Sequence, residues 1–378
     1  MHARPPARFM GLVWHGEIET PFDSDEWVRI DLVMDALIRV AVDVVSRACA
    51  VSRRVQLGFQ FGNQLSKNDA SPVTVADFAV QALVLYELKS AFPEHVFIAE
   101  ESAEPLRNDP VLAKYVLDAV NSGRKAGHAL LSVSDICGAI DLGLHVGGDL
   151  KDTWVLDPID GTKGFMRKQQ YCIALGFLRN GIPSLGVLGC PNLPERLENT
   201  ATYEARAEVE GGSIFHAVVA DHVAYMQSAS VPEPLYNTPV RVCEEKEAMM
   251  AVFMESVEAA HSSHGISAQV ASLLGVSQPP VRMDSQVKYG SLSRGDATIF
   301  LRFPRGGYVE NIWDHAAGVV VLSAAGGHVS DGTGAPLDFS KGRKLNNQMG
   351  IVATNGVLHD AVVEAVRLAF EESGTRAQ

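Results

Sequence analysis

The sequence lacks several features that would each indicate a particular class of protein. No apolar run approaches the ~20 residues that a membrane-spanning helix needs, so we expect no membrane association. The 32 Lys and Arg residues are outnumbered by 45 Asp and Glu, which gives a net charge of −13. Such a charge repels polyanions, so a nucleic-acid polymer is not an expected partner.

Cysteine is also scarce. The five cysteines form no C-x-x-C pair and no zinc-ligand spacing, so a structural zinc site is not expected. An odd, dispersed set is typical of buried thiols in a reducing compartment, which favours a cytoplasmic location. The first 26 residues carry Arg4 and Arg8 before the first acid, Glu17. We expect a loose tail there, with an organellar import segment as the alternative.

The rest of the composition is that of a folded globular protein. The chain has 378 residues, 47% of them hydrophobic, which is enough to bury a core without disulfide bonds. Periodic apolar positions predict helices at 28–48, 74–92, 264–274, 315–325 and 357–371. Short β-rich runs predict strands at 95–98, 154–156, 171–178, 184–188, 213–219 and 239–242. Residues 102–152 are weakly patterned, and we expect mostly loops there. The alternation predicts an α/β fold of layered sheets and helices.

Acidic residues stand at the ends of several predicted elements. Asp77 lies in the first turn of a helix, and Glu100 and Glu101 follow a strand. Asp314 opens another helix. Each has a structural explanation by itself: Thr74 and Asp77 have capping-box spacing, the two glutamates suit a solvated turn, and Asp314 suits a helix N-terminus.

The clearest pattern is the turn that contains Asp157 and Asp160. Pro158 fixes the backbone between them, so both carboxylates and the Ile159 carbonyl can converge on a cation. Mg²⁺ prefers such oxygen ligands and usually shares them with substrate phosphates. Thr162 then begins a helix, where a hydroxyl and free N–H groups suit an anion. Because α/β folds present their crevice at strand ends, the acidic residues together predict a magnesium and phosphate site.

These motifs resemble the magnesium-dependent, lithium-sensitive phosphatases of the inositol monophosphatase superfamily. The family pattern is present in order: Asp at 77, Glu-Glu at 100–101, Asp-Pro-Ile-Asp-Gly-Thr at 157–162 and Trp-Asp at 313–314. The similarity covers about residues 30–370. It implies a five-layer αβαβα sandwich made of an α+β half (27–195) and an α/β half (196–378), with the site between them.

Further segments are similar to one branch of that superfamily, the 3'(2'),5'-bisphosphate nucleotidases. These segments are 71–77, 163–165, 189–193, 283–290 and 301–304. The branch implies hydrolysis of the 3'-phosphate of adenosine 3',5'-bisphosphate and of 3'-phosphoadenosine 5'-phosphosulfate, a reaction of sulfur metabolism. Two alternatives use the same fold: an inositol polyphosphate 1-phosphatase, and a non-catalytic nucleotide sensor. Loss of a metal ligand would favour the sensor, and none is lost.

The resemblance also implies a role for each site residue. Two or three Mg²⁺ ions would be held by Glu100, Asp157, the Ile159 carbonyl, Asp160 and Asp314. Asp77 and Thr162 would be catalytic, because they would orient and deprotonate the attacking water. The small-molecule nucleotide would contact Thr162, His261, Ser285, Lys288, Arg302 and Asp314. Taken alone, Lys288 and Arg302 also fit surface cations on a strand.

Overall fold

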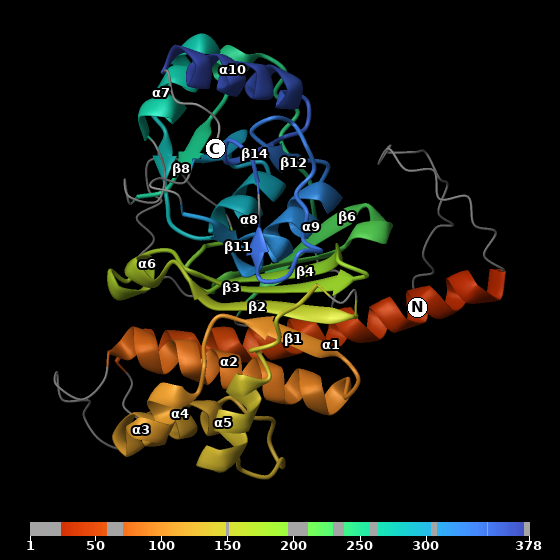
Figure 1. Ribbon diagram of the computed structural model, residues 1–378, viewed down its shortest axis with the longest axis vertical. Helices are drawn as coiled ribbons and strands as arrows, with labels where there is room; N and C mark the ends of the chain where they lie inside the picture. The colour runs from red at the N-terminus through yellow and green to blue at the C-terminus, as the bar shows by residue number, and fades with distance from the viewer. Residues whose placement is uncertain are drawn as a thin grey trace.

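The computed structural model describes residues 24–58, 71–148, 151–195, 211–229, 238–257, 264–303, 308–345 and 347–373. These residues form stacked layers in which helices and sheets alternate (Figure 1). Two long helices support a seven-stranded sheet, a pair of helices separates it from a five-stranded sheet, and two more helices cover the top. The predicted five-layer αβαβα sandwich is confirmed.

The helical layer on the outer face of the seven-stranded sheet consists of α1 (Ser24–Gln56) and α2 (Pro72–Ala91). Both were predicted, and α1 begins inside the expected tail, of which residues 1–23 lie outside the described residues. Pro72 occupies the first turn of α2, where a fixed φ and a missing N–H suit a helix start. Thr74 therefore lies within the helix and not at its N-cap, so the capping-box explanation of Asp77 is wrong.

The seven-stranded sheet has its strands in sequence order. They are β1 (Val96–Ala99), β2 (Thr153–Asp160), β3 (Cys172–Arg179), β4 (Ile182–Cys190), β5 (Ser213–Val218), β6 (Val223–Ser228) and β7 (Thr238–Val240). Only the β1–β2 pair is parallel. The predicted β3–β4 hairpin is confirmed, and Asn180 and Gly181 turn it with positive φ values of 52° and 77°. The sheet continues past the boundary expected at 195/196, and a division into two halves there stays a prediction.

The segment expected to be loops contains three helices, and that expectation was wrong. They are α3 (Glu104–Asn108), α4 (Pro110–Ser122) and α5 (Val133–Asp141), which lie beneath α2 in Figure 1. The Asp109 carboxylate caps α4 by accepting N–H bonds from Val111 and Leu112, and Ser132 and Asp135 form a capping box on α5. α3 is only five residues long, but the buried Leu112, Val116 and Val120 of α4 follow a helical spacing that the sequence analysis missed.

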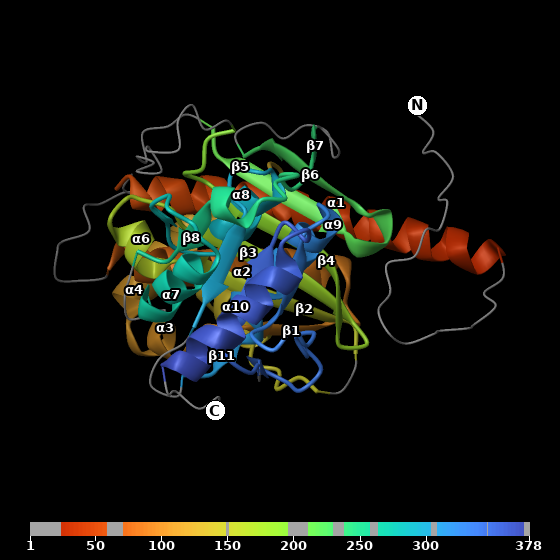
Figure 2. The same cartoon turned by 90° about the horizontal axis from the view of Figure 1, so that it is seen from above.

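The five-stranded sheet has the order β12-β14-β10-β8-β9. Its strands are β8 (Phe253–Glu255), β9 (Val281–Arg282), β10 (Ile299–Arg302), β12 (His328–Asp331) and β14 (Ile351–Thr354). The helices α7 (His264–Leu273) and α10 (His359–Glu372) lie side by side across its outer face (Figure 2). A separate two-stranded ribbon pairs β11 (Glu310–Asn311) with β13 (Lys344–Leu345).

Between the two sheets lie α8 (Val287–Ser293) and α9 (Ala316–Ala324). Their close packing depends on a small residue, because a Cβ at Gly318 would stand 2.2 Å from the Tyr289 ring. In the described part of the chain no helix is long and apolar enough to cross a membrane. All five cysteines are free thiols, four of them buried and Cys243 partly exposed. The expectation of buried thiols is confirmed for those four.

Candidate active site

The predicted acidic residues meet at one edge of the seven-stranded sheet. Because β1 and β2 are parallel and Ala99 pairs with Leu156, the residues that follow, Glu100 and Asp157, lie side by side just past the end of β1. The β2–β3 register then shifts between Asp157 and Asp160, where Pro158 cannot donate to the sheet. The strand therefore bends at the Asp-Pro-Ile-Asp turn, and its two carboxylates leave the regular alternation of the sheet.

Burial and mutual repulsion raise the pKa values of this cluster. Asp157 is 3% exposed, and burial, then the charges of Glu100 and Asp160, raise its pKa well above the ordinary value. Burial and the neighbouring Glu101 raise the pKa of Glu100 to about 7. Burial is also the main cause that raises the pKa of Asp314 to about 6. The cluster thus has too little positive charge nearby to balance its carboxylates.

The donor chemistry of the cluster fits a hard cation. Asp157 Oδ1 is buried and has no hydrogen-bond partner among the described residues, a costly state for a carboxylate oxygen. Mg²⁺ would satisfy it, because this ion takes carboxylate and carbonyl oxygens. In the ranges that the structure describes, no three His, Cys, Asp or Glu side chains already converge tightly enough to coordinate one ion. The proposed ligands therefore lie near one another, but no three of these side chains are close enough to coordinate a single ion.

The two predicted catalytic residues flank this cluster. Asp77 lies on α2 and is 8% exposed, and burial, followed by the charges of Glu101 and Glu100, raises its pKa well above the ordinary value. Thr162 begins α6 (Thr162–Met166), and its hydroxyl donates to the Ile159 carbonyl over 3.4 Å. A carboxyl group with a raised pKa is a better proton acceptor near neutral pH than an ordinary one.

Gln286 joins two parts of the site, and it was not among the predicted site residues although it lies in the segment 283–290 that resembles the nucleotidases. Its backbone N–H donates to Asp160 Oδ2 at 2.6 Å. Its side chain donates to the Trp313 carbonyl at 2.8 Å and accepts from the Gly318 N–H at 3.1 Å. Gln286 therefore joins one carboxylate of the cluster to the segment that carries Asp314. The resemblance of segment 283–290 marked this region, but a neutral side chain gave no indication of which residues it would bridge.

Two of the predicted nucleotide-binding residues lie on the segment that includes Gln286. Ser285 has φ 71°, and its hydroxyl accepts the Val287 N–H at 3.3 Å. Lys288 is only 1% exposed; its Nζ donates to the Met283 carbonyl at 3.0 Å. Burial lowers the Lys288 pKa to about 8. The alternative of a surface lysine on a strand was wrong, because α8 turns Lys288 into the interior.

Arg302 ends β10 and is held by a buried carboxylate that the sequence analysis missed. Its Nε and Nη2 donate to the two carboxylate oxygens of Glu310 at 2.6 and 2.9 Å, and Glu310 is fully buried. His315 Nε2 lies 3.6 Å from the same carboxylate, and His315 Nδ1 is 2.9 Å from the Tyr289 hydroxyl. This arrangement fixes the guanidinium plane and leaves Nη1 as its remaining donor nitrogen. The predicted ligand His261 lies outside the described residues.

Comparisons with known proteins show which family the chain resembles. The chain matches the model of the inositol monophosphatase family over residues 33–370. A 3'(2'),5'-bisphosphate nucleotidase of Oryza sativa is 41% identical over 355 residues, which cover 90% of this chain and 96% of that protein. A protein of the same name from Emericella nidulans is 39% identical over 351 residues, covering 87% and 96% of the two chains.

The solved structures that resemble this one share its fold at lower identity. An inositol monophosphatase from Anabaena (Nostoc) sp. PCC 7120 aligns with a TM-score of 0.54 at 20% identity, covering 89% of this chain and 96% of that one. An inositol monophosphatase from Zymomonas mobilis gives 0.56 at 17% identity, over 88% and 98% of the two chains. The match to the family model and the identity to the nucleotidases together show that the chain belongs to the inositol monophosphatase family.

Proposed function

We propose that the chain is a magnesium-dependent phosphatase that removes the 3'-phosphate of adenosine 3',5'-bisphosphate or 3'-phosphoadenosine 5'-phosphosulfate. The observation that carries the proposal is a site with two poles. One pole is the crowded carboxylate cluster around Asp157, with its unpartnered buried oxygen. The other consists of Lys288 and Arg302, whose charges lower the pKa of Asp160 against the effect of its burial. Two poles suit a substrate with two phosphates, and the names of the similar nucleotidases support the same reading.

The carboxylate pole would hold the metal. The oxygens that would bind Mg²⁺ belong to Glu100, Asp157, Ile159 (through its carbonyl), Asp160 and Asp314. When bound, such ions neutralise the phosphate and activate a water molecule for in-line attack. Asp77 would accept a proton from the attacking water, since burial and its acidic neighbours keep its proton affinity high. Thr162, whose hydroxyl lies against the Ile159 carbonyl, would orient that water and contact the reacting phosphate.

The cationic pole would hold the far end of the nucleotide. Arg302 would contact the 5'-phosphate through Nη1, because Glu310 already engages the other two nitrogens. Lys288 would add charge from the interior, and Ser285 and His261 would contact the nucleotide. Binding energy from a phosphate remote from the scissile bond can be used to orient the reacting one. The substrate with both phosphates would therefore react faster than one that lacks the 5'-phosphate.

Phosphate release from a substrate panel tests the proposal. The panel contains adenosine 3',5'-bisphosphate, 3'-phosphoadenosine 5'-phosphosulfate, inositol monophosphate and inositol polyphosphates, each with Mg²⁺, with excess chelator, and with Mg²⁺ plus lithium. We expect both nucleotides to be preferred, chelator to abolish turnover, and low lithium to inhibit. Full turnover in chelator would contradict the metal assignment. Preference for inositol polyphosphates would replace the nucleotide assignment, and no turnover on any member would favour a nucleotide sensor.

A further inference from the structure

Arg343 connects two parts of the chain that are far apart in sequence and adjacent in the site. Its Nη2 donates to the Ala99 carbonyl at 2.7 Å, across 244 residues of chain. Its Nη1 donates to the carbonyls of Gly143 at 2.8 Å and His145 at 3.3 Å. The guanidinium carbon lies 4.6 Å from the centre of the Trp313 ring, within reach of a cation–π contact.

Two of the residues that Arg343 contacts lie immediately before a proposed metal ligand in the sequence. Ala99 is followed by Glu100 at the end of β1, and Trp313 is followed by Asp314. The backbone takes part as well, because the Arg343 carbonyl accepts the Ile312 N–H at 3.0 Å. Arg343 thus fixes the end of β1, which Glu100 follows, relative to the 3₁₀ turn Ile312–Asp314.

We propose that Arg343 is a positioning residue that sets the separation of Glu100 and Asp314, and thereby the affinity of the site for Mg²⁺. The proposal rests on the proposed function. A guanidinium suits this role because its planar, rigid fork can donate to several carbonyls at once while it stacks on a ring. The loop behind it is tightly packed: a Cβ at Gly147 would stand 2.9 Å from Gly342 Cα.

A purely electrostatic role of Arg343 would change the affinity for Mg²⁺ in the opposite direction to a positioning role. The charge of Arg343 and the carboxylate of Glu100 influence each other, and a cation beside a metal site repels the metal. If Arg343 acted only through its charge, Arg343→Met would therefore tighten Mg²⁺ binding. If it acts by position, Arg343→Met weakens binding, and so does Arg343→Lys, which keeps the charge and loses the fork. The sign of the change separates the two roles.

The experiment measures Mg²⁺ binding to the full chain by titration calorimetry, and the Mg²⁺ concentration for half-maximal phosphate release. We expect Arg343→Met to weaken binding about 10- to 100-fold, as loss of a residue that orients metal ligands does. Arg343→Lys should give a smaller loss in the same direction. The loss of turnover relative to the wild type should be smaller in both variants at saturating Mg²⁺ than at limiting Mg²⁺.

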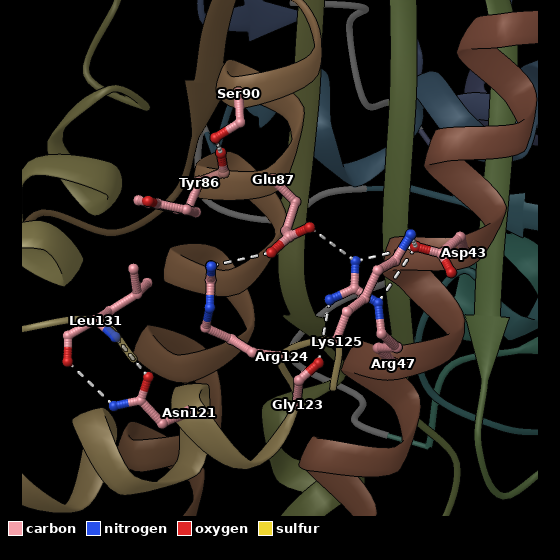
Figure 3. A network of polar contacts seen from close by, with 10 residues as sticks. All are labelled: Asp43, Arg47, Tyr86, Glu87, Ser90, Asn121, Gly123, Arg124, Lys125 and Leu131. Carbon is pink, nitrogen blue, oxygen red and sulfur yellow. Dashed lines mark hydrogen bonds and ion pairs between the residues drawn. The ribbon is translucent and has the colours of Figure 1, made fainter. Parts of the chain in front are cut away.

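Arg124 provides the matched control (Figure 3). Its guanidinium also lies over a ring, 4.8 Å from the centre of Tyr86, and its Nη1 pairs with Glu87 at 3.0 Å. Arg124→Met and Arg124→Lys should lower Tm and leave the Mg²⁺ dissociation constant unchanged.

Three outcomes decide the matter. Unchanged or tighter Mg²⁺ binding by Arg343→Met would overturn the positioning role. If Arg343→Met does not fold, unchanged Mg²⁺ binding by Arg343→Lys would overturn it. An Mg²⁺ effect of equal size in the Arg124 variants would also overturn it, because general loosening of the fold would then explain the result. Wild-type chain that neither binds Mg²⁺ nor needs it would instead contradict the proposed function.

Discussion

The helical layer and the edge of the seven-stranded sheet each gather charged side chains, and they balance those charges differently. On α1, α2 and the turn after α4, Arg47 pairs with Asp43 at 3.0 Å and with Glu87 at 3.1 Å. Arg124 also pairs with Glu87, and Lys125 with Asp43, each at 3.0 Å (Figure 3). Each carboxylate in this network faces two cations, which is typical of a cluster that stabilises the fold.

At the sheet edge the carboxylates face one another instead. Glu100, Asp160 and Asp314 all raise the pKa of Asp157 beyond the effect of burial. Such repulsion between carboxylates opposes folding unless a cation is bound. The same residue type thus contributes to stability in the helical network and to ligand binding at the edge. Loss of a carboxylate should therefore have opposite consequences at the two places.

Asp160→Asn should have the largest effect. It removes one anionic ligand and keeps an oxygen for the Gln286 N–H, so the fold should persist. At limiting Mg²⁺ we expect turnover to fall about 100-fold or more, beyond the loss caused by mutating residues that only orient ligands. In chelator, Tm should rise by a few degrees, because burial disfavours the charged form of Asp160. Near-normal turnover at limiting Mg²⁺ would show that Asp160 is not a ligand.

The matched change in the balanced network is Glu87→Gln. It weakens two ion pairs whose carboxylate is 13% exposed, and charged hydrogen bonds of this kind contribute roughly 1.5–3 kcal/mol each. This variant should lose thermal stability and keep the Mg²⁺ dependence of the wild type. If it lost Mg²⁺ affinity as Asp160→Asn does, the two clusters would not be functionally distinct.

Arg302→Ala should have the next largest effect, and a selective one. We expect kcat/KM for adenosine 3',5'-bisphosphate to fall about 10- to 100-fold relative to adenosine 3'-monophosphate, which lacks the contacted phosphate. Thr162→Ala, at the reacting centre, should impair both substrates equally. Because Arg302→Ala leaves Glu310 buried without its main partner, the double variant with Glu310→Gln should give the same ratio. An unchanged ratio would favour an inositol polyphosphate substrate.

The smallest predicted effect is a pH dependence of stabilisation by Mg²⁺. The folded pKa values of Asp314 and Glu100 are raised to about 6 and about 7. Without metal, stability from these protonated groups is present near pH 4 and is lost as pH rises through those values. The gain in Tm on adding Mg²⁺ should therefore increase by a few degrees between pH 5 and pH 7.5. Burial lowers the pKa of His359 to about 3. This histidine should affect Tm equally with and without Mg²⁺, so it does not change the gain in Tm. A constant gain across this range would contradict the repulsion described.

The sequence was sufficient for the elements whose signals are local. Periodic apolar residues located α1 and α10, and Asn180-Gly181 located the β3–β4 turn. The acidic motifs could be assigned to one place because β1 and β2 end at the same sheet edge.

Contacts between distant segments could not be predicted in this way. Gln286 reaches Asp160 across 126 residues, and Arg343 reaches Ala99 across 244. Glu310 precedes Asp314 by only four positions, yet its partner is set by a neighbouring strand, β10. The interior position of Lys288 follows from the packing of α8 between the sheets. None of these side chains has a spacing that reveals its partner.

The contact between Ala99 and Arg343 has a consequence for synthesis of the chain. A ribosome makes Glu100, Asp157 and Asp160 early, and Asp314 much later, yet the residue that joins the two sides comes 29 positions after Asp314. A nascent or prematurely terminated chain that stops before Arg343 thus contains every proposed ligand without the bridge between them. Activity would therefore arise only after Arg343 has been made, and a chain truncated before Arg343 would be inactive although it keeps every proposed metal ligand.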